Sequence, residues 1–386
     1  MKPRVSILCH TLAGNALGRA WVFHELLRDD FEIELVVSAR GSDEVWKPLA
    51  QSGLCPRRWF LRTWPGFRWR ARSIARELVT GDLIIAIKPR LHSFGLALAA
   101  RRERQRPLLL DVDDWELGFF SPWSDVAIAP LSWLSAASNF HTRWYFRRTA
   151  LADAITVSTT YLARRLGGTC IPHARRGILP DERAPSPHPL VMFAGTPRPH
   201  KGLPDLVQAF RSVRRADARL CIIGAESDPA LAHAAADDPR IQIERSVAID
   251  SLPERLARAW VVVIPQRDGI VSRAQLPAKL IDAMALGKAI VSTDVGDMAS
   301  WLSDDCGLVV PPGDPYQLGA AIEALLGDAG RRHRLGANAR ARFLERASEH
   351  AVRPRLLAIV DALLAGRSAP AASDGSNFYA AEFEGT

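Results

Sequence analysis

The stretch Leu276-Pro277-Ala278-Lys279-Leu280-Ile281-Asp282-Ala283-Met284-Ala285-Leu286-Gly287 decides the fold of the second half of this chain. Its apolar residues recur at positions i, i+4, i+5 and i+8, which predicts a short helix with one apolar face. Pro277 suits the first turn of that helix, and Gly287 suits its end. An apolar strand precedes the helix at 259–265 and another follows it at 288–294. The segment therefore predicts one βαβ unit of a parallel sheet.

The start of this helix predicts an anion site. A helix N-terminus at the carboxyl end of parallel strands presents unpaired N–H groups and a positive dipole end, which attract a diphosphate. Gln275, Leu276 and Lys279 lie at or beside this start, and we expect them to contact the ligand. Asp282 lies further along, where a carboxylate can accept hydrogen bonds from ribose hydroxyls. The segment therefore predicts a site for a nucleotide-sugar.

A basic loop, Phe193-Ala194-Gly195-Thr196-Pro197-Arg198-Pro199-His200-Lys201-Gly202, leaves an earlier strand and enters a helix. Gly195 allows a ligand to approach the backbone closely, and Thr196 follows it. Arg198 and Lys201 place two cations where phosphates would meet the sheet. A solvated turn is the alternative interpretation. The loop converges with the helix described above in fold order, which favours a phosphate site.

The whole chain alternates strand-like and helical patterns, which predicts an α/β fold with helix-covered parallel sheets. Four prolines within 180–189 predict a stiff linker. From Gly366 the composition turns to small and polar residues, as in a disordered tail. We expect two doubly wound, Rossmann-like domains that face each other across a cleft. Their predicted bounds are 1–182 (acceptor-binding), 183–189 (linker), 190–348 (donor-binding), 349–365 (a closing helix packed on the first domain) and 366–386 (tail).

Composition places the chain among soluble globular proteins, with 48% apolar and 24% charged residues in 386. No run approaches the ~20 apolar residues of a membrane span, and the apolar run near the N-terminus is too short for a signal peptide. The 5 cysteines are scattered without C-x-x-C spacing. They indicate reduced thiols in a cytoplasmic protein and argue against a zinc site.

The net charge of +8 calls for an anionic partner. Arginines and aromatic residues interleave in 57–76, which holds no acidic residue, and aromatic residues gather again in 115–148. Indole tolerates the headgroup layer and guanidinium attracts anionic lipid, so these segments predict contact with an anionic membrane surface. The alternative is a core of aromatic residues beneath a solvated arginine face. Nucleic acid is not favoured, because no nucleic-acid module accompanies the charge.

Clustered carboxylates lie at the end of a strand expected at 108–112, in Asp111-Val112-Asp113-Asp114. We expect Asp113 to lie near the transferred sugar or the acceptor hydroxyl. Such a cluster could instead hold a hard cation, but we expect no metal because the site already has cationic groups. In a purely structural interpretation Asp114 caps a turn. His10 and His200 are secondary candidates.

These motifs resemble the donor-binding domain of GT-B glycosyltransferases, and specifically glycosyltransferase family 4. The first half resembles the family mainly in layout, with Gly14 in the loop after the first strand. We expect Gly14 and Gly224, which follows another strand, to lie close to the donor. The matching segments are 195–202, 282–287, 292–296 and 310–314.

The resemblance implies a nucleotide-diphosphate sugar donor, retention at the anomeric carbon and no required metal or other cofactor. By position Lys201 would hold the diphosphate, and Asp282 would bind ribose where the family usually has glutamate. Three departures stand out: Ala274 replaces the first glutamate of the family's pair, Thr196 replaces an arginine, and Asp113 replaces a histidine.

We therefore expect a retaining hexosyltransferase that acts on a saccharide acceptor, lipid-linked, in surface polysaccharide or glycolipid synthesis. Asp113, Arg198 and Lys201 are the expected catalytic residues. The expected location is the cytoplasm, either in solution or on the inner membrane face. The alternatives are a non-catalytic module that binds nucleotide or glycan and, less favoured, an epimerase. A dehydrogenase is disfavoured because the first loop lacks G-x-G-x-x-G.

Overall fold

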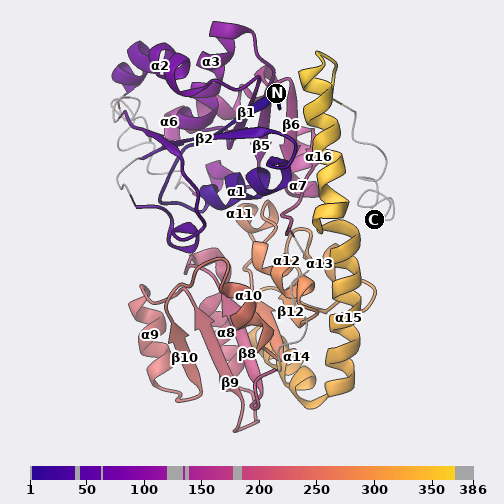
Figure 1. Cartoon of the computed structure of the whole chain (residues 1–386). Coiled ribbons are helices and arrows are strands. Elements are labelled where there is room, and N and C mark those ends of the chain that lie inside the picture. Colours follow the sequence, from indigo (N-terminus) through magenta and orange to yellow (C-terminus); the bar gives the residue numbers. More distant parts are fainter. Residues whose placement is uncertain are drawn as a thin grey trace. The chain divides into compact units, whose positions relative to one another are not determined.

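The computed structural model divides the chain into two compact units. Unit 1 takes residues 1–172 and 352–386, and unit 2 takes residues 173–351. Each unit is built on one sheet with helices packed around it, and Figure 1 labels the elements. The predicted linker and tail fall partly outside the described residues. The described ranges are 2–39, 44–61, 64–119, 134, 139–176 and 185–369.

Unit 1 contains a 7-stranded parallel sheet in the order β3-β2-β1-β4-β5-β6-β7. Strands β4 and β5 are buried along their whole length, as apolar strands covered by helices on both faces are. The order reverses between β1 and β4, and ligands bind at such switch points. The strands are β1 Arg4–Cys9, β2 Glu32–Ser38, β3 Arg57–Trp59, β4 Leu83–Ile87, β5 Leu108–Val112, β6 Ala154–Val157 and β7 Thr169–Cys170.

Helices connect these strands. Thr159 caps helix α7, because its side chain accepts a hydrogen bond from the Leu162 N–H. From Val352 on, helix α16 belongs to unit 1, where Arg353 donates to the Leu26 carbonyl and pairs with Asp30. The helices of this unit are α1 Ala16–Leu27, α2 Trp64–Leu78, α3 Leu96–Arg104, α6 Asn139–Phe146, α7 Thr160–Leu166 and α16 Glu349–Leu364, with the short turns η1 Lys47–Leu49, η2 Leu91–Gly95, η3 Glu116–Phe119 and η4 Thr149–Leu151.

Unit 2 contains a 6-stranded parallel sheet in the order β10-β9-β8-β11-β12-β13. Its strands are β8 Leu190–Ala194, β9 Arg219–Ile223, β10 Ile241–Glu244, β11 Val261–Ile264, β12 Ala289–Thr293 and β13 Leu308–Val310. Its helices are η5 Pro199–Lys201, α8 Leu203–Arg211, α9 Pro229–Ala236, α10 Leu252–Ala257, α11 Ile270–Arg273, α12 Ala278–Ala285, α13 Met298–Leu302, α14 Pro315–Gly327 and α15 Ala329–Arg346.

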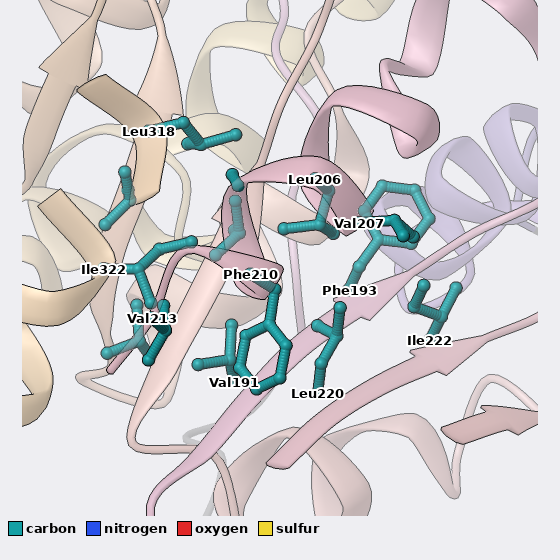
Figure 2. Packing of buried hydrophobic residues seen from close by; sticks show 14 of the residues in the cluster. Val191, Phe193, Leu206, Val207, Phe210, Val213, Leu220, Ile222, Leu318 and Ile322 are labelled. Carbon is teal, nitrogen blue, oxygen red and sulfur yellow. The ribbon is translucent and has the colours of Figure 1, made fainter. Parts of the chain in front are cut away.

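One face of the unit 2 sheet packs against helices α8 and α14, as Figure 2 shows. Phe193 and Leu220 from the strands meet Phe210 and Ile322 from the helices, and all four are fully buried. Burying each such side chain contributes about 1.5–3 kcal/mol. This packing fixes β8, whose last residue leads into the basic loop.

The α/β fold with two Rossmann-like sheets is confirmed. The decisive helix spans Ala278–Ala285, and Pro277 is its extended N-cap rather than a residue of its first turn. Gly287 ends the segment with a φ of +62°, which suits glycine after a helix. No helix in the part of the chain that the structure describes is both long and apolar enough to span a bilayer.

Candidate functional site

In unit 2, the loop after β8 lies close to its neighbours because it contains glycine. Gly195 has a φ of +143°, and its N–H donates to the Ile223 carbonyl of β9 at 2.9 Å. A Cβ atom on Gly195 would lie 2.9 Å from Nζ of Lys279. Gly224, after β9, lies against the same backbone, since its own Cβ would be 3.2 Å from the Gly195 carbonyl oxygen. Two strand ends thus form a backbone-lined corner beside Lys279.

The amino group of Lys279, in the first turn of helix α12, is buried. The residue is 8% exposed, and Nζ lies 3.3 Å from the centre of the Phe193 ring. No hydrogen-bond acceptor among the described residues reaches this Nζ. Burial lowers the pKa of Lys279 well below its usual value, and the charge of Lys201 lowers it further. A cation–π contact contributes about 0.5–2 kcal/mol, which offsets only part of the cost of burial.

Lys201 and Gln275 meet at the same site. The Lys201 ammonium donates to Oε1 of Gln275. Helix α12 follows Pro277, and none of the described side chains caps its N-terminus. The Leu280 N–H donates to the Pro277 carbonyl, whereas the positive end of the helix dipole stays available to an anion. Two lysine side chains, a glycine-containing loop and the start of a helix together suit a diphosphate.

The other predicted donor residues contribute less through their side chains. Leu276 is 1% exposed and packs in the core. Thr196 and Arg198 have exposed side chains. The Arg198 carbonyl accepts a hydrogen bond from the Lys201 N–H at 2.9 Å, so its backbone helps to shape the turn that presents Lys201.

Asp282, predicted to bind ribose, forms a buried ion pair with Arg175. Nε of Arg175 lies 2.5 Å from Oδ1 of Asp282, and Nη2 lies 3.0 Å from Oδ2. Both side chains are nearly inaccessible to solvent, at 9% and 5% exposed. The position of the family's first glutamate, Ala274, is fully buried. Through its pair with Arg175, the Asp282 carboxylate therefore holds the 173–176 segment on helix α12.

In unit 1, Asp111 serves the structure. Its carboxylate accepts two hydrogen bonds from Arg19, at 2.8 and 2.9 Å, and one from the Thr156 hydroxyl at 2.8 Å. Arg19 also donates to the carbonyls of Ile171 and Pro172. This fully buried pair ties helix α1 to β5 and to the end of the unit.

A second buried cluster surrounds Lys88, which the sequence analysis did not single out. Lys88 follows β4 with a φ of +68°, unusual for a residue with a side chain. Its ammonium lies 2.6 Å from Asp114, 2.7 Å from Glu116 and 3.4 Å from Asp113. Of the acids that could cap a turn or bind a cation, Asp113 and Asp114 therefore lie beside a lysine, whereas Asp111 pairs with Arg19. The described residues contain no group of three or more metal-ligating side chains.

Asp113 differs from the other acids of this cluster. Its Oδ1 has no hydrogen-bond partner among the described residues, although Lys88 lies 3.4 Å away. Burial raises the pKa of Asp113 to about 7, with the charge of Lys88 opposing the shift. Its position at the carboxyl end of β5 is close to the switch point of the sheet.

Gly14 lies in the loop after β1 of the same unit, where a Cβ would be 2.7 Å from Thr11.

The structure thus brings Gly195, Lys201, Gly224, Gln275 and Lys279 together in unit 2. The sequence patterns did not predict a role for Arg175 or for Lys88. A basic residue before proline at a strand end is the sole local signal for Lys88. Arg175 gives none, because its partner lies 107 positions away.

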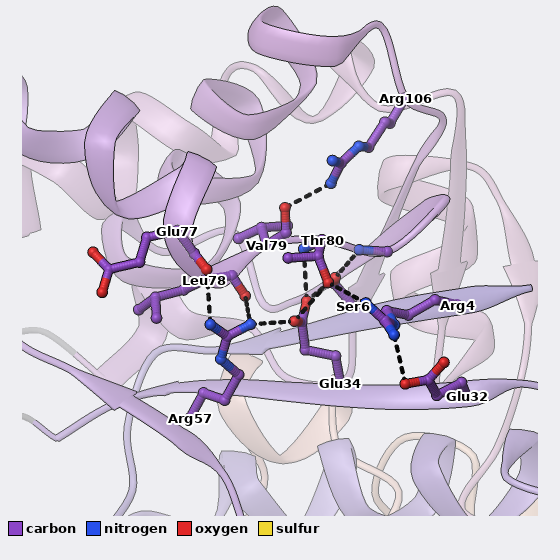
Figure 3. A network of polar contacts seen from close by, with 11 residues as sticks. Arg4, Ser6, Glu32, Glu34, Arg57, Glu77, Leu78, Val79, Thr80 and Arg106 are labelled. Atoms are coloured by element: carbon purple, nitrogen blue, oxygen red, sulfur yellow. Dashed lines mark hydrogen bonds and ion pairs between the residues drawn. The ribbon is translucent and has the colours of Figure 1, made fainter.

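The arginine-rich segment 57–76 divides between structural and exposed side chains. Figure 3 shows Arg57 bonded to Glu34 and to the carbonyls of Glu77 and Leu78, so Arg57 holds β3 against the sheet. Arg72 and Arg76 pair with Glu103, with N–O distances of 3.6 and 2.6 Å. Trp59 and Phe67 are buried. The core interpretation therefore accounts for this half of the segment.

Other aromatic residues of helices α2 and α6 are exposed. Trp69 is 78% exposed, Phe140 48% and Trp144 44%. The guanidinium of Arg148 lies 3.5 Å from the centre of the Trp144 ring. The two helices are neighbours, because the ring centres of Trp64 in α2 and His141 in α6 lie 4.9 Å apart.

Comparisons with known proteins agree with this architecture. Over 93% of this chain, the structure of Anabaena Alr3699/HepE in complex with UDP and glucose superposes with a TM-score of 0.70 at 15% identity, and all of that chain is covered. Sucrose-phosphate synthase from Thermosynechococcus elongatus gives a TM-score of 0.68 at 16% identity over 95% of this chain and 100% of its own. This chain has the GT-B fold.

The family-model comparison concerns the second unit of the chain. Residues 188–328 match the family model described as Glycosyl transferases group 1, which confirms the resemblance to GT-B glycosyltransferases. The D-inositol 3-phosphate glycosyltransferase of Xylanimonas cellulosilytica is 32% identical over 169 residues, which are 41% of this chain and 38% of that protein. The Alpha-D-kanosaminyltransferase of Streptomyces kanamyceticus is 25% identical over 173 residues, which are 43% of this chain and 44% of that protein. The chain therefore spans less than half the length of the curated relatives that it matches.

Proposed function

We propose that this chain is a glycosyltransferase that moves a hexose from a nucleotide-diphosphate sugar to an acceptor hydroxyl. The observation that carries the proposal is the pair of Lys201 and Lys279 beside Gly195 and the uncapped start of helix α12. This corner lies within the 188–328 stretch that matches the glycosyl transferase model. The solved complex of Alr3699/HepE with UDP and glucose makes UDP-glucose the first donor to test.

The lysines have a direct role in the proposed reaction. When the bond between the sugar and the diphosphate breaks, negative charge develops on the departing phosphate oxygen. Lys201, Lys279 and the N–H groups of helix α12 stabilise this charge, with Arg198 as a third cation on the loop. They supply the positive charge that a metal ion supplies in other transferases, so we propose a metal-independent reaction.

We propose retention at the anomeric carbon. The acceptor oxygen forms its bond to that carbon on the face from which the diphosphate leaves. The acceptor proton passes to the departing phosphate oxygen, so charge and atoms balance without a protein nucleophile. The stereochemistry of the product, read by NMR from the first transferred sugars, distinguishes retention from inversion.

Unit 1 is the proposed acceptor domain. Asp113, just after β5, has a carboxylate oxygen that accepts no hydrogen bond from the described residues, and we propose that an acceptor hydroxyl donates to it. The exposed Trp69, Phe140 and Trp144, together with neighbouring arginines, support a lipid-linked saccharide acceptor at the inner face of the cell membrane. Such a reaction belongs to surface polysaccharide or glycolipid synthesis.

The test compares two lysine variants of the full chain. Purified protein is incubated with UDP-glucose, GDP-mannose or ADP-glucose, and nucleoside diphosphate release is measured. Loss of a group that stabilises a departing oxyanion costs about 10²–10³-fold in rate, so Lys201→Ala should reduce release to that extent. Lys288, which donates to the Ala257 carbonyl away from the site, is the matched control. Equal rates for wild type and Lys201→Ala would refute the assignment.

One observation favours a second candidate, a module that binds nucleotide-sugar without transferring it. Ala274 is apolar and buried, and Asp282 is paired with Arg175, so neither position offers an unengaged carboxylate. Donor binding without any nucleoside diphosphate release, with or without acceptor, would favour this candidate over the transferase.

A further inference from the structure

We propose that Lys279 is uncharged in the unliganded protein and takes up a proton from solvent when a nucleoside diphosphate binds. The inference rests on the proposed function, since it assigns the diphosphate to the corner beside Gly195. It adds a property that the general likeness to GT-B proteins does not supply: binding of the donor is linked to pH through one lysine.

The surroundings of the Lys279 side chain carry the proposal. The side chain is more than nine-tenths buried, and Nζ has no acceptor among the described residues. The Phe193 ring lies 3.3 Å away on one side, and the Gly195 backbone closes another. A lysine that is buried and lacks a counter-ion is more stable in its neutral form. Its low pKa in the structure agrees with this.

The charged groups on the neighbouring elements do not compensate. Lys201 on η5 carries the same charge and lowers the pKa of Lys279. Asp282, on the same helix, has both carboxylate oxygens bonded to Arg175. On α15, Arg340 donates to the Ala285 carbonyl at the far end of helix α12.

Helix α10, which also packs against α12, carries Glu254 and Arg255, and Arg255 pairs with Glu244. No acceptor from this helix reaches Nζ of Lys279 among the described residues. An anion is therefore the missing partner of Lys279. A diphosphate in the corner would bring negative charge to Nζ and reverse the balance. The neutral amine then gains a proton from solvent and becomes an ammonium that pairs with a phosphate oxygen. Near Lys201, a second permanent cation would repel the first in the unliganded protein, whereas the neutral amine does not.

Isothermal titration calorimetry at pH 8.5 tests the proposal directly. UDP, GDP and ADP are the probes, because their terminal phosphate, with a pKa near 6, is fully ionised at this pH. Titrations in buffers of different ionisation enthalpy count the protons taken up. We expect uptake approaching one proton per diphosphate bound, and up to a tenfold loss of affinity per pH unit above the pKa of the unliganded Lys279.

Three variants assign the proton. Lys279→Met should bind more weakly with no uptake, and Lys279→Arg, which stays charged, should bind without uptake. Lys201→Met should bind more weakly with uptake unchanged. Circular dichroism checks that each variant is folded.

The outcomes separate the two proposals. Tight diphosphate binding by wild type with no proton uptake overturns the role of Lys279 and leaves the proposed function standing. Uptake that persists in Lys279→Met overturns it as well, because another group then takes the proton. If none of the three diphosphates binds the wild-type chain, the proposed function fails together with this inference.

Discussion

Arg175 and Asp282 form a bidentate ion pair inside unit 2, with contacts of 2.5 and 3.0 Å between their side chains. The pair joins a segment that precedes the sheet of the unit to helix α12, which also carries Lys279. Asp282 thus positions the helix whose start forms the candidate diphosphate site. One buried contact links the stability of the unit to the geometry of that site.

Removing one partner of this pair should be costly. Arg175→Met leaves the Asp282 carboxylate buried without a cation, and such changes cost about 3–5 kcal/mol. We expect a correspondingly lower urea midpoint for unit 2, measured by near-UV circular dichroism. The control is Arg176→Met, because Arg176 pairs with Glu349 at the longer distance of 3.8 Å. A second change, Asp282→Leu, should restore part of the loss, and equal midpoints for both arginine variants would contradict the prediction.

Gly195 should be required for binding more than for folding. In Gly195→Ala the new methyl group would meet Nζ of Lys279 at 2.9 Å, with a strained φ of +143°. We expect at least tenfold weaker nucleoside diphosphate binding. Gly313→Ala is the matched control, since its φ is +76° but no atom lies within 4 Å of the added Cβ. It carries backbone strain of about 1–3 kcal/mol yet should leave the dissociation constant unchanged. Similar losses in both variants would mean that strain alone is responsible.

Asp113 should make the stability of unit 1 depend on pH. The pKa of this acid rises from 3.8 to about 7 on folding because of burial. The folded state therefore holds the proton more tightly than the unfolded chain, so the contribution of Asp113 to stability is fully present below about pH 4 and is lost as the pH rises through 7. Between pH 4.5 and 7.5 the loss is about 3 kcal/mol.

The variant Asp113→Asn cannot titrate and should lose this part of the dependence in urea unfolding experiments. Lys88→Met should raise the apparent pKa of Asp113, because Lys88 is the main charge that opposes the shift. A wild-type profile that matches that of Asp113→Asn across this range would rule out a buried, titrating Asp113.

The exposed aromatic residues of unit 1 should mediate contact with anionic membranes. Wild-type protein should float with vesicles rich in phosphatidylglycerol at low salt and dissociate at high salt, because the attraction is screened. Trp69→Ala combined with Trp144→Ala should reduce the bound fraction several-fold. Tyr316, which is 80% exposed in unit 2, provides the control Tyr316→Ala. Equal flotation of neutral and anionic vesicles would exclude this surface as an anionic-lipid site.

Local patterns in the sequence predicted much of the fold. The apolar repeat and the flanking strands placed helix α12 to within two residues of its observed start, and Gly287 marked its end. The basic loop and the helix start were predicted to converge because both follow strands of one parallel sheet, and Lys201 does meet Gln275. These features depend on short-range signals and on a general rule of α/β topology.

Long-range pairing could not be predicted in the same way. Nothing near Asp282 indicates that Arg175 will occupy both of its oxygens, because the two meet only through the fold. The aspartates at the end of β5 gave a carboxylate-rich pattern, but the lysine beside Asp113 and Asp114 is Lys88, which follows β4 and adopts a φ of +68° that is disfavoured for a residue with a side chain. Whether a single aromatic residue is buried also depends on tertiary packing: Trp59 is buried, whereas Trp69 is exposed.

A crystal structure of the full chain with a bound nucleoside diphosphate tests the central claim most directly. The account predicts phosphate oxygens within hydrogen-bond distance of Nζ of both Lys201 and Lys279, beside the Gly195 backbone and the first N–H groups of helix α12. A diphosphate bound elsewhere, with Lys279 still buried against Phe193 and without an anionic partner, would contradict it.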